Sequence, residues 1–281
     1  MEILISFIIP FIILLTVVVF IHEYGHYYYA KKYGVGVTDF SIGFGKEIFG
    51  FNDKSGTRWK FCLIPLGGYV KFFGDRNVFS QAEQAELLKK YSEEDQKKLF
   101  VVKPLYQRSL IVAAGPFANF LLAILIFAFI YMFAGKDFTP AQIQEVQPDS
   151  PAYEVGIKSG DIIKSINDKE VKSIMEVSAF INSSSSNIID IGILRNDNEL
   201  NFSVEPKVIK SEDALGNKAN KKIIGIKIAP LNEEINRQRL GPATALFYAI
   251  KETWFVIDAS WNFIISMFKG TGDTTQLGGP I

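Results

Sequence analysis

The sequence is poor in the residues that most often carry metal or redox chemistry, with one cysteine and two histidines among 281 residues. A single cysteine excludes an internal disulfide and gives no basis for a cysteine metal site, so we interpret Cys62 as a small apolar side chain. An excess of one charge is also missing, because 30 basic and 30 acidic residues give a formal net charge of zero. This balance gives no general case for a nucleic-acid partner.

Charged residues are absent from two long stretches, Ile3–Ile21 and Ser109–Phe133. A hydrocarbon core about 30 Å thick needs roughly 20 apolar residues of helix. We therefore predict one transmembrane helix within residues 1–32 and a second at 109–133. The alternative for the first is a cleaved signal peptide, but no basic residue precedes the run and no small-residue cleavage site follows it.

Basic residues near the ends of these helices predict their orientation. Lys31 and Lys32 follow the first helix, and Lys103 and Arg108 precede the second. Because positive charge favours the cytoplasmic side, we expect residues 33–108 in the cytoplasm, and the N-terminus and everything after Phe133 outside.

The cytoplasmic loop has two predicted parts. Residues 57–73 are rich in β-branched and aromatic side chains around Gly67 and Gly68, which predicts a β-hairpin with an edge strand marked by Pro65. Residues 81–100 are charged and predict a solvated surface helix.

Residues 134–232 have the composition of a small, mostly β domain. Short strand-like runs (AQIQEV, DIIKSI, IIDIGILR, LNFSVEP and KIIGIKI) alternate with turn residues, and one helix is predicted at Ser173–Ile181. Residues 233–269 are predicted to form an amphipathic juxtamembrane helix that lies on the outer surface of the same membrane. The alternative is that they form a third, imperfect transmembrane helix. Residues 270–281 are expected to begin a further membrane segment.

The two histidines lie four residues apart, at the end of the first apolar run, with Glu23 between them. On a helix, His22 and His26 share one face and can offer two imidazole nitrogens to one ion. Two His ligands with a Glu as general base is the arrangement of zinc proteases, and ionisable residues next to lipid usually mark function. The sequence therefore predicts a Zn²⁺ site inside the membrane, with Glu23 as the catalytic residue.

Several segments resemble the site-2 protease family, and specifically its bacterial regulator of sigma-E protease group. They are FIHEYGHYYYAKKYGVGVTDFSIGFG, LIPLGGYVKFFGD, QRSLIVAAGPFANFLLA and GPATALFYAIKETW. The resemblance implies that His22 and His26 are zinc ligands and that Glu23 is the catalytic acid and base. It also matches DSPAYEVGIKSGDIIKSINDKEV to a PDZ domain. The predicted fold class is thus an α-helical membrane protein with an inserted small, mostly β, PDZ-like domain and HExxH on the first transmembrane helix.

Two further groups are candidates for contact with substrate. Gly115, Pro116 and Asn119 match the family's G-P-x-x-N element, where small residues allow close helix packing and Asn119 can hydrogen-bond across it. The hairpin residues Gly67, Gly68 and Tyr69 are candidates for holding an unwound substrate by β-augmentation. The alternatives are helix packing for the first group and a purely structural hairpin for the second.

One element of the family pattern is missing from these residues. The family's third zinc ligand is an Asp in an L-D-G element on a later membrane helix, and no such element occurs in the sequence. We expect the chain to be truncated before that helix or inactive as it stands. Asp258, the acidic residue inside the late apolar run, is the alternative ligand.

Two functions of different class remain open. The first is an intramembrane zinc metalloendopeptidase in a bacterial inner membrane, acting on single-pass membrane proteins such as anti-sigma factors or signal-peptide remnants. The second is a non-catalytic, membrane-anchored PDZ protein that binds peptide C-termini or periplasmic proteins.

Overall fold

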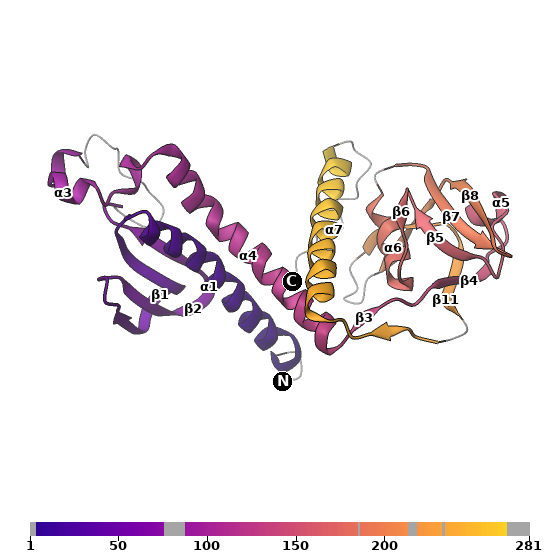
Figure 1. The fold of residues 1–281 in the computed structure, drawn as a ribbon, viewed down its shortest axis with the longest axis horizontal. Helices are drawn as coiled ribbons and strands as arrows, with labels where there is room; N and C mark the ends of the chain where they lie inside the picture. Colours follow the sequence, from indigo (N-terminus) through magenta and orange to yellow (C-terminus); the bar gives the residue numbers. More distant parts are fainter. Residues whose placement is uncertain (1–3, 76–87, 185, 213–217, 232–233, 269–281) are drawn as a thin grey trace. The chain divides into compact units, whose positions relative to one another are not determined.

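The computed structural model describes residues 4–75, 88–184, 186–212, 218–231 and 234–268. The chain forms two compact units, Met1–Leu125 and Ile126–Ile281 (Figure 1). Helix α4 (Leu105–Phe133) passes from the first unit into the second. The predicted membrane segment at 270–281 lies outside the described residues.

Helix α1 (Ile9–Lys32) carries the HExxH motif, as predicted, and follows a short π-helical turn, η1 (Leu4–Ile8). It ends where Gly34 adopts a left-handed conformation with a φ of 64°. There the Val35 N–H donates to the Ala30 carbonyl at 2.8 Å and the Gly34 N–H to the Lys31 carbonyl at 3.1 Å. This is the Schellman pattern, in which glycine tolerates the backbone that stops a helix. The helix therefore ends six residues after His26.

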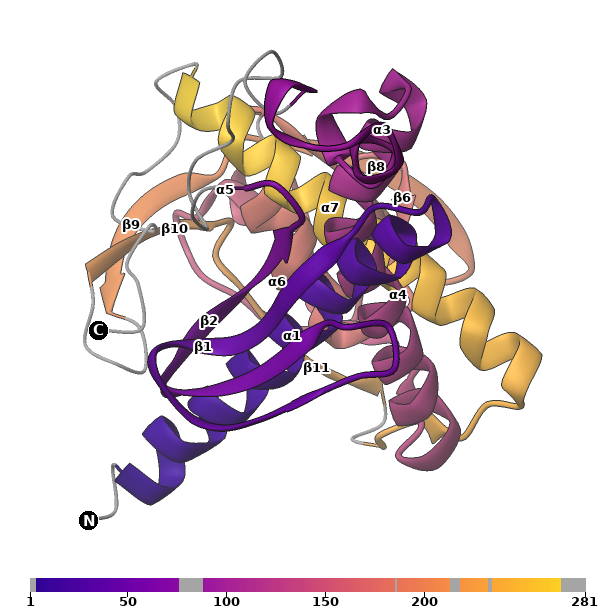
Figure 2. The same ribbon diagram turned by 90° about the vertical axis from the view of Figure 1, so that its left-hand side faces the viewer.

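An antiparallel two-stranded sheet follows α1 and lies against it (Figure 2). Its strands are β1 (Val37–Asn52) and β2 (Arg58–Phe72). The turn between them is built on Asp53, whose Oδ1 accepts hydrogen bonds from the backbone N–H groups of Ser55 and Thr57, at 2.8 and 2.9 Å. Gly56 supplies the left-handed residue that the turn needs, with a φ of 83°.

The prediction of a hairpin turn at Gly67 and Gly68 is wrong, because both residues lie inside β2. A Cβ on Gly68 would lie 2.6 Å from the Ser41 carbonyl oxygen and 2.9 Å from Val19 Cγ1. Glycine inside a strand often marks such a close approach rather than a turn. The two glycines thus let β2 lie close to β1 and α1. Strand β1 itself was not predicted from the sequence.

The surface helix predicted for residues 81–100 is not continuous in its described part. Residues 76–87 lie outside the described residues. After them, residues 88–90 are helical, Tyr91 and Ser92 interrupt the helix, and the short helix α3 (Glu93–Gln96) and the 3-10 turn η2 (Phe100–Val102) follow. Ser92 caps α3 by accepting from the Asp95 N–H at 3.3 Å. A capping serine begins a new helix rather than continuing one, which accounts for the break.

Helix α4 begins four residues before the predicted start at 109 and ends at the predicted Phe133. Pro116 lies inside it, and because proline has no N–H the Val112 carbonyl loses its intrahelical donor. In the described part of the chain, Ile5–Lys32 and Leu105–Phe133 are the helices long and apolar enough to cross a membrane, judged by length and composition.

The second unit contains the mostly β domain that the sequence predicts. Its larger sheet is antiparallel with the strand order β11-β4-β5-β7-β8, and β6 pairs with β5. Helix α6 (Ile174–Ser183) lies where a helix is expected. The strands are β4 (Ala141–Val146), β5 (Ile162–Ile166), β6 (Lys169–Glu170), β7 (Ile189–Arg195), β8 (Asn198–Val204) and β11 (Ile226–Pro230).

Smaller elements complete this unit. The short helix α5 (Pro151–Glu154) is capped by Ser150, whose side chain accepts from the Tyr153 N–H. Two further antiparallel pairs are β9 (Lys207–Glu212) with β10 (Lys218–Ile223), and β3 (Lys136–Asp137) with β12 (Arg237–Gln238). The core of the domain is aliphatic and includes Ile143, Ile163, Ile166, Val177, Ile189, Ile191 and Val204.

Helix α7 (Pro242–Phe268) covers the predicted amphipathic segment. Ala245, Ala249 and Thr253 are buried on one side. Val256 is exposed close to that side, and the other exposed large apolar side chains are Leu246, Phe247, Ile250, Trp254, Trp261, Ile264 and Phe268. Their spacing of three, four and seven residues places them on one face, so α7 is amphipathic as expected. Its location on a membrane surface stays a prediction.

Candidate metal centre

The HExxH residues lie together on α1, on the side that faces α4 within the first unit. The rings of His22 and His26 lie one helical turn apart in an edge-to-face contact, with their centroids 4.8 Å apart and their planes at 80°. The helical spacing of four residues brings them to one face, as the sequence predicts. Glu23 follows His22 directly along the same helix.

Gly115 of α4 lies directly opposite the two histidines. A Cβ added to Gly115 would lie 2.7 Å from His22 Nε2, and nearer still to His26 Nε2. Both Nε2 atoms therefore approach a single point, which stays open because residue 115 has no side chain. Glycine is required here for space, since no Cβ tolerates contacts this short.

The contact between α1 and α4 also depends on a glycine of α1. A Cβ on Gly25 would lie 2.8 Å from the Ala114 carbonyl carbon and 3.1 Å from Ala118 Cβ. Small residues on both helices let the two backbones approach closely, as is common between membrane helices. The structure thus brings Gly115 to the histidines, as the sequence suggests for the G-P-x-x-N element.

Each histidine uses its other ring nitrogen in a contact with α4. His26 Nδ1 lies 2.8 Å from the Ile111 carbonyl oxygen. His22 Nδ1 lies 3.2 Å from Asn119 Nδ2. Both Nδ1 atoms therefore contact polar atoms of α4, and both Nε2 atoms are directed at the open point beside Gly115.

The other predicted site residues lie at different distances from the motif. A Cβ on Gly68 would lie 3.3 Å from Glu23 Cγ, and the Val70 backbone donates a hydrogen bond to the Glu23 carboxylate. Gly67 faces the Phe44 ring instead, and the Tyr69 ring stacks on Phe44 with centroids 6.1 Å apart.

Two predicted residues do not face the histidines. Pro116 is exposed on α4, so its effect is on the helix backbone. Asp258 belongs to the second unit, where its carboxylate lies 2.5 Å from Lys169 Nζ.

The donor set fits part of a zinc site. Zinc binds imidazole nitrogen at about 2.0–2.1 Å, and catalytic sites use three protein ligands with a fourth position open. His22 and His26 supply two nitrogens that approach one point. The Asn119 Oδ1 beside them is buried and has no hydrogen-bond partner among the residues that the structure describes. Among the described residues, no group of three His, Cys, Asp or Glu side chains is placed to hold an ion.

Asp53, which was not predicted as a site residue, joins the β1–β2 hairpin to α1 by hydrogen bonds. Asp53 Oδ2 accepts from the Tyr27 hydroxyl at 2.7 Å and from Trp59 Nε1 at 3.2 Å, while its Oδ1 serves the turn. Tyr27 follows His26 on α1, so this contact lies next to the motif. The D-x-S-G-T spacing of an Asx turn is the sequence signal that could have identified it.

The environment of Asp53 favours its ionised form. Burial alone would raise the pKa of this carboxyl group, but hydrogen bonds from Tyr27, Ser55, Thr57 and Trp59 outweigh that effect. The pKa of Asp53 therefore lies well below its ordinary value. A lowered pKa means that folding favours the carboxylate, so protonation weakens the folded state.

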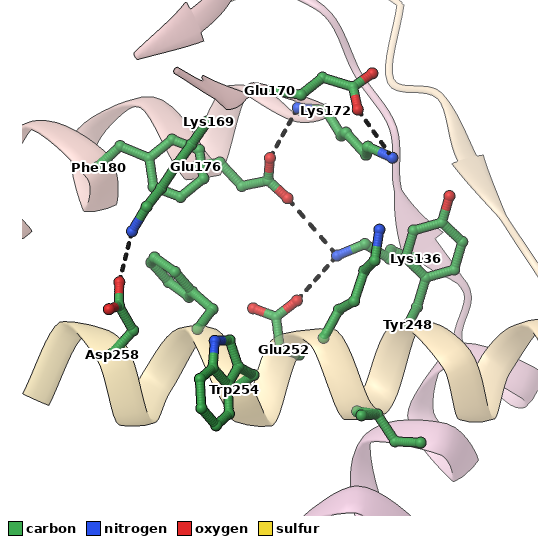
Figure 3. Close-up of a pocket in the computed structure, with 13 residues that line it drawn as sticks. Lys136, Lys169, Glu170, Lys172, Glu176, Phe180, Tyr248, Glu252, Trp254 and Asp258 are labelled. Atoms are coloured by element: carbon green, nitrogen blue, oxygen red, sulfur yellow. Dashed lines mark hydrogen bonds and ion pairs between the residues drawn. The ribbon is translucent and has the colours of Figure 1, made fainter. Parts of the chain in front are cut away.

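The second unit contains a separate cavity of about 600 Å³ between α6, β6 and α7 (Figure 3). Four lysines and four carboxylates line it, with apolar contact from Phe180 and Phe255, whose ring centroids are 5.2 Å apart. The charged groups pair across it. The pairs are Lys136–Glu252 at 3.0 Å, Lys136–Glu176 at 3.8 Å, Lys169–Asp258 at 2.5 Å and Lys172–Glu170 at 3.2 Å.

Comparison with known proteins gives one family and a set of bacterial relatives. The family model described as peptidase family M50 matches residues 10–281. A "Putative zinc metalloprotease" of Mesorhizobium japonicum is 39% identical over 276 residues, covering 97% of this chain and 74% of the relative. A protein of Rickettsia conorii with the same description is 41% identical over 277 residues, covering 98% and 74%. "Metalloprotease MmpA" of Caulobacter vibrioides is 31% identical over 274 residues, covering 95% and 68%.

Solved structures match a smaller part of the chain. The PDZ domain of an SdrC-like protein from Listeria monocytogenes covers 32% of this chain and 88% of its own, with 24% identity and a TM-score of 0.26. The corresponding domain from Listeria innocua covers 34% and 99%, with 23% identity and a TM-score of 0.26. With TM-scores this low, these matches do not assign a fold to the β domain. That it is a PDZ-like domain stays a prediction.

The Asp53 contact leads to a pH-dependent prediction. Asp53→Asn should destabilise the first unit by about 2 kcal/mol at pH 7, because hydrogen bonds to a charged acceptor contribute roughly 1.5–3 kcal/mol. The pKa of Asp53 is lowered on folding, so its contribution is complete above the unfolded value of about 4. It is lost as the pH falls further toward the folded value. Thermal unfolding of both proteins in detergent, from pH 7 to pH 3, measures the difference.

The matched control is Asp197→Asn, an exposed turn aspartate with a φ of 62° that an asparagine tolerates equally. It should leave the melting temperature unchanged at every pH. A difference between wild type and Asp53→Asn that is the same at pH 7 and pH 3 would contradict the assignment.

Proposed function

The chain belongs to peptidase family M50, and we propose that it is an intramembrane zinc endopeptidase that cuts the membrane-spanning segments of single-pass membrane proteins. The observation that carries the proposal is the approach of His22 Nε2 and His26 Nε2 to one point, with Glu23 beside them on the same helix. That helix is long and apolar enough to cross a membrane, which supports a reaction within the bilayer. The names of the three bacterial relatives support the zinc metalloprotease chemistry.

His22 and His26 are the residues that would hold zinc. When bound, zinc would polarise the scissile carbonyl and favour deprotonation of water, so that a hydroxide nucleophile would be available near neutral pH. The resemblance to the site-2 proteases predicts that an Asp on another membrane helix is the third ligand. Asp258 is not proposed in its place, because it forms an ion pair with Lys169 in the second unit.

Glu23 is the proposed general base and acid. Its carboxylate would take a proton from the attacking water and pass it to the amide nitrogen that leaves. The Val70 N–H, which donates to this carboxylate, orients it toward the side of α1 where β2 lies. Glu23 is not a proposed metal ligand, so its substitution separates chemistry from metal binding.

The β1–β2 sheet is the proposed holder of the substrate. A transmembrane substrate is helical, with its backbone groups bonded internally, so it must unwind before its carbonyl can react. Among the described residues, Gly68–Phe72 of β2 pair with Val37–Ile42 of β1 and with no second strand, so their other side is an edge. An extended segment can add to such an edge by main-chain hydrogen bonds. Gly68 and Val70 place part of β2 beside Glu23, which supports β2 as the edge next to the reacting groups.

A second candidate function belongs to the β domain. Strand β11 is at the edge of the larger sheet, and a cavity of about 270 Å³ lies between it and α6. Apolar side chains line the cavity, among them Val177, Ile181, Ile224, Ile226 and Ile228. An edge strand beside a helix is the geometry in which PDZ domains bind an extended peptide, so this domain is proposed to bind peptide termini of extracytoplasmic proteins.

A steric filter that rejects substrates with bulky outer domains is the other proposal for the β domain. Titration of labelled peptides with free C-termini onto the protein separates the two, because only the first requires saturable binding.

The proposed mechanism predicts that Glu23→Gln abolishes cleavage and keeps zinc. Glutamine has nearly the same shape as glutamate but cannot accept the proton. Cleavage of a model transmembrane substrate in detergent and elemental zinc analysis are measured on the same preparation. Glu154→Gln, at an exposed position of the β domain, is the matched control and should cleave normally. Normal turnover by Glu23→Gln would contradict the mechanism.

The proposed location is a bacterial cytoplasmic membrane, with residues 33–108 inside and the β domain outside. In a Cys62→Ser background, a cysteine at the exposed Glu94 should react with a membrane-impermeant thiol reagent only after the membrane is opened. A cysteine at the exposed Asn196 should react in intact spheroplasts. Labelling with the reverse pattern would show that the basic residues were assigned to the wrong side.

A further inference from the structure

The two candidate zinc ligands must each present a lone pair at Nε2. A neutral imidazole has one protonated nitrogen and one with a free lone pair. A histidine that binds a metal through Nε2 therefore carries its proton on Nδ1, and that N–H is almost always bonded to an acceptor that fixes the ring. The acceptors at the two Nδ1 atoms accordingly decide whether both rings can bind one ion.

His26 already has the required acceptor. Its Nδ1 lies 2.8 Å from the Ile111 carbonyl oxygen of α4. A carbonyl can only accept, so the proton lies on Nδ1 and the lone pair on Nε2. That lone pair is directed at the open point beside Gly115.

His22 differs, because its Nδ1 contacts a side-chain amide. Asn119 Nδ2 lies 3.2 Å from His22 Nδ1, and Asn119 Oδ1 is buried with no hydrogen-bond partner in the described part of the chain. In this orientation the amide donates to Nδ1 and the ring proton lies on Nε2. The two histidines then direct one lone pair and one N–H at the same point, which cannot hold a cation.

A half-turn of the Asn119 amide resolves this conflict. The oxygen and nitrogen of an amide occupy nearly the same shape, so the exchange needs no extra space. Oδ1 then accepts from His22 Nδ1–H, and His22 Nε2 is free to bind. In either orientation, one of the two amide atoms has no hydrogen-bond partner, so hydrogen bonding alone does not decide between them. The bound cation therefore selects the orientation in which Oδ1 accepts from His22.

We propose that Asn119 is a positioning residue for the metal centre, which holds His22 through its side-chain oxygen so that Nε2 can bind zinc. This inference rests on the proposed function, because it requires zinc at His22 and His26. It also gives a reason for the spacing of the G-P-x-x-N element. Gly115 and Asn119 are four residues apart on α4, so they share one face, where the glycine opens the space at Nε2 and the asparagine contacts Nδ1.

Zinc affinity in detergent, measured by competition with a chromogenic chelator, tests the proposal without depending on activity. Asn119→Leu keeps the approximate size but has no acceptor, and should lower the affinity roughly 10- to 100-fold, the usual effect of losing such a partner. Asn119→Asp keeps an acceptor and should bind zinc nearly as tightly as wild type. Gln107→Leu makes the same kind of change elsewhere on α4 and should have no effect.

Nitrogen NMR of imidazole-labelled protein gives a second readout, which a loss of packing alone would not change. The chain has two histidines, so each ring can be assigned by the loss of its signals in His22→Ala. In zinc-loaded wild type, both rings should carry the proton on Nδ1. In Asn119→Leu without zinc, the His26 spectrum should be unchanged and the His22 spectrum altered.

The outcomes separate this proposal from the proposed function. Zinc binding by wild type that is no tighter than by His22→Ala would overturn both. Tight binding by wild type and equally tight binding by Asn119→Leu would overturn the role of Asn119 alone. So would an Asn119→Asp protein as weak as Asn119→Leu. If Asn119→Leu does not fold, Asn119→Ala takes its place in the same comparison.

Discussion

Gly25 and Gly115 let the backbones of α1 and α4 come into direct contact, and the candidate metal centre depends on that contact. A Cβ at either position would overlap atoms of the opposite helix, 2.8 Å from the Ala114 carbonyl carbon in one case and 2.7 Å from His22 Nε2 in the other. In lipid, where burial of apolar surface gives little drive for association, close packing of small residues is a main source of helix contact. The same contact brings Ile111 and Asn119 within reach of the two Nδ1 atoms.

The hairpin is fixed to this helix pair from the other side. Asp53 receives hydrogen bonds from Tyr27 on α1 and from Trp59 on β2, and so joins the turn to the helix next to His26. Gly68 lets β2 pass close to Val19 and Glu23. Glu23, the proposed general base, therefore lies on the helix that would hold the metal and next to the strand proposed to hold the substrate.

Features that depend on residues near one another in the chain could be predicted from the sequence. The uncharged runs gave α1 and α4, the four-residue spacing placed His22 and His26 on one face, and alternation with turn residues gave most strands of the β domain. Gly115 and Asn119 were selected through the family resemblance. Their contacts with the histidines span more than eighty residues, and only the structure supplies those.

The error in the hairpin arises because a glycine can have two structural roles. Gly67 and Gly68 were interpreted as a turn, but they lie within β2, where the missing side chains allow close approach to β1 and α1. The actual turn is at Asp53, whose side-chain hydrogen bonds to Ser55 and Thr57 add to the backbone hydrogen bonds from Asp53 N–H to Thr57 and from Gly56 N–H to Asp53. Sequence pattern alone does not separate a glycine that bends the chain from one that makes room for a neighbour.

The most direct test of this account is the effect of one methyl group at position 115 on zinc binding. Gly115→Ala would place a Cβ in the point that both Nε2 atoms approach, whereas Gly241→Ala adds the same group where no atom lies within 4 Å. Zinc content and affinity of both variants, compared with wild type in the same detergent, measure the difference. The account predicts wild-type binding for Gly241→Ala and loss of most bound zinc for Gly115→Ala. Equal affinity in all three proteins would contradict a metal centre between α1 and α4.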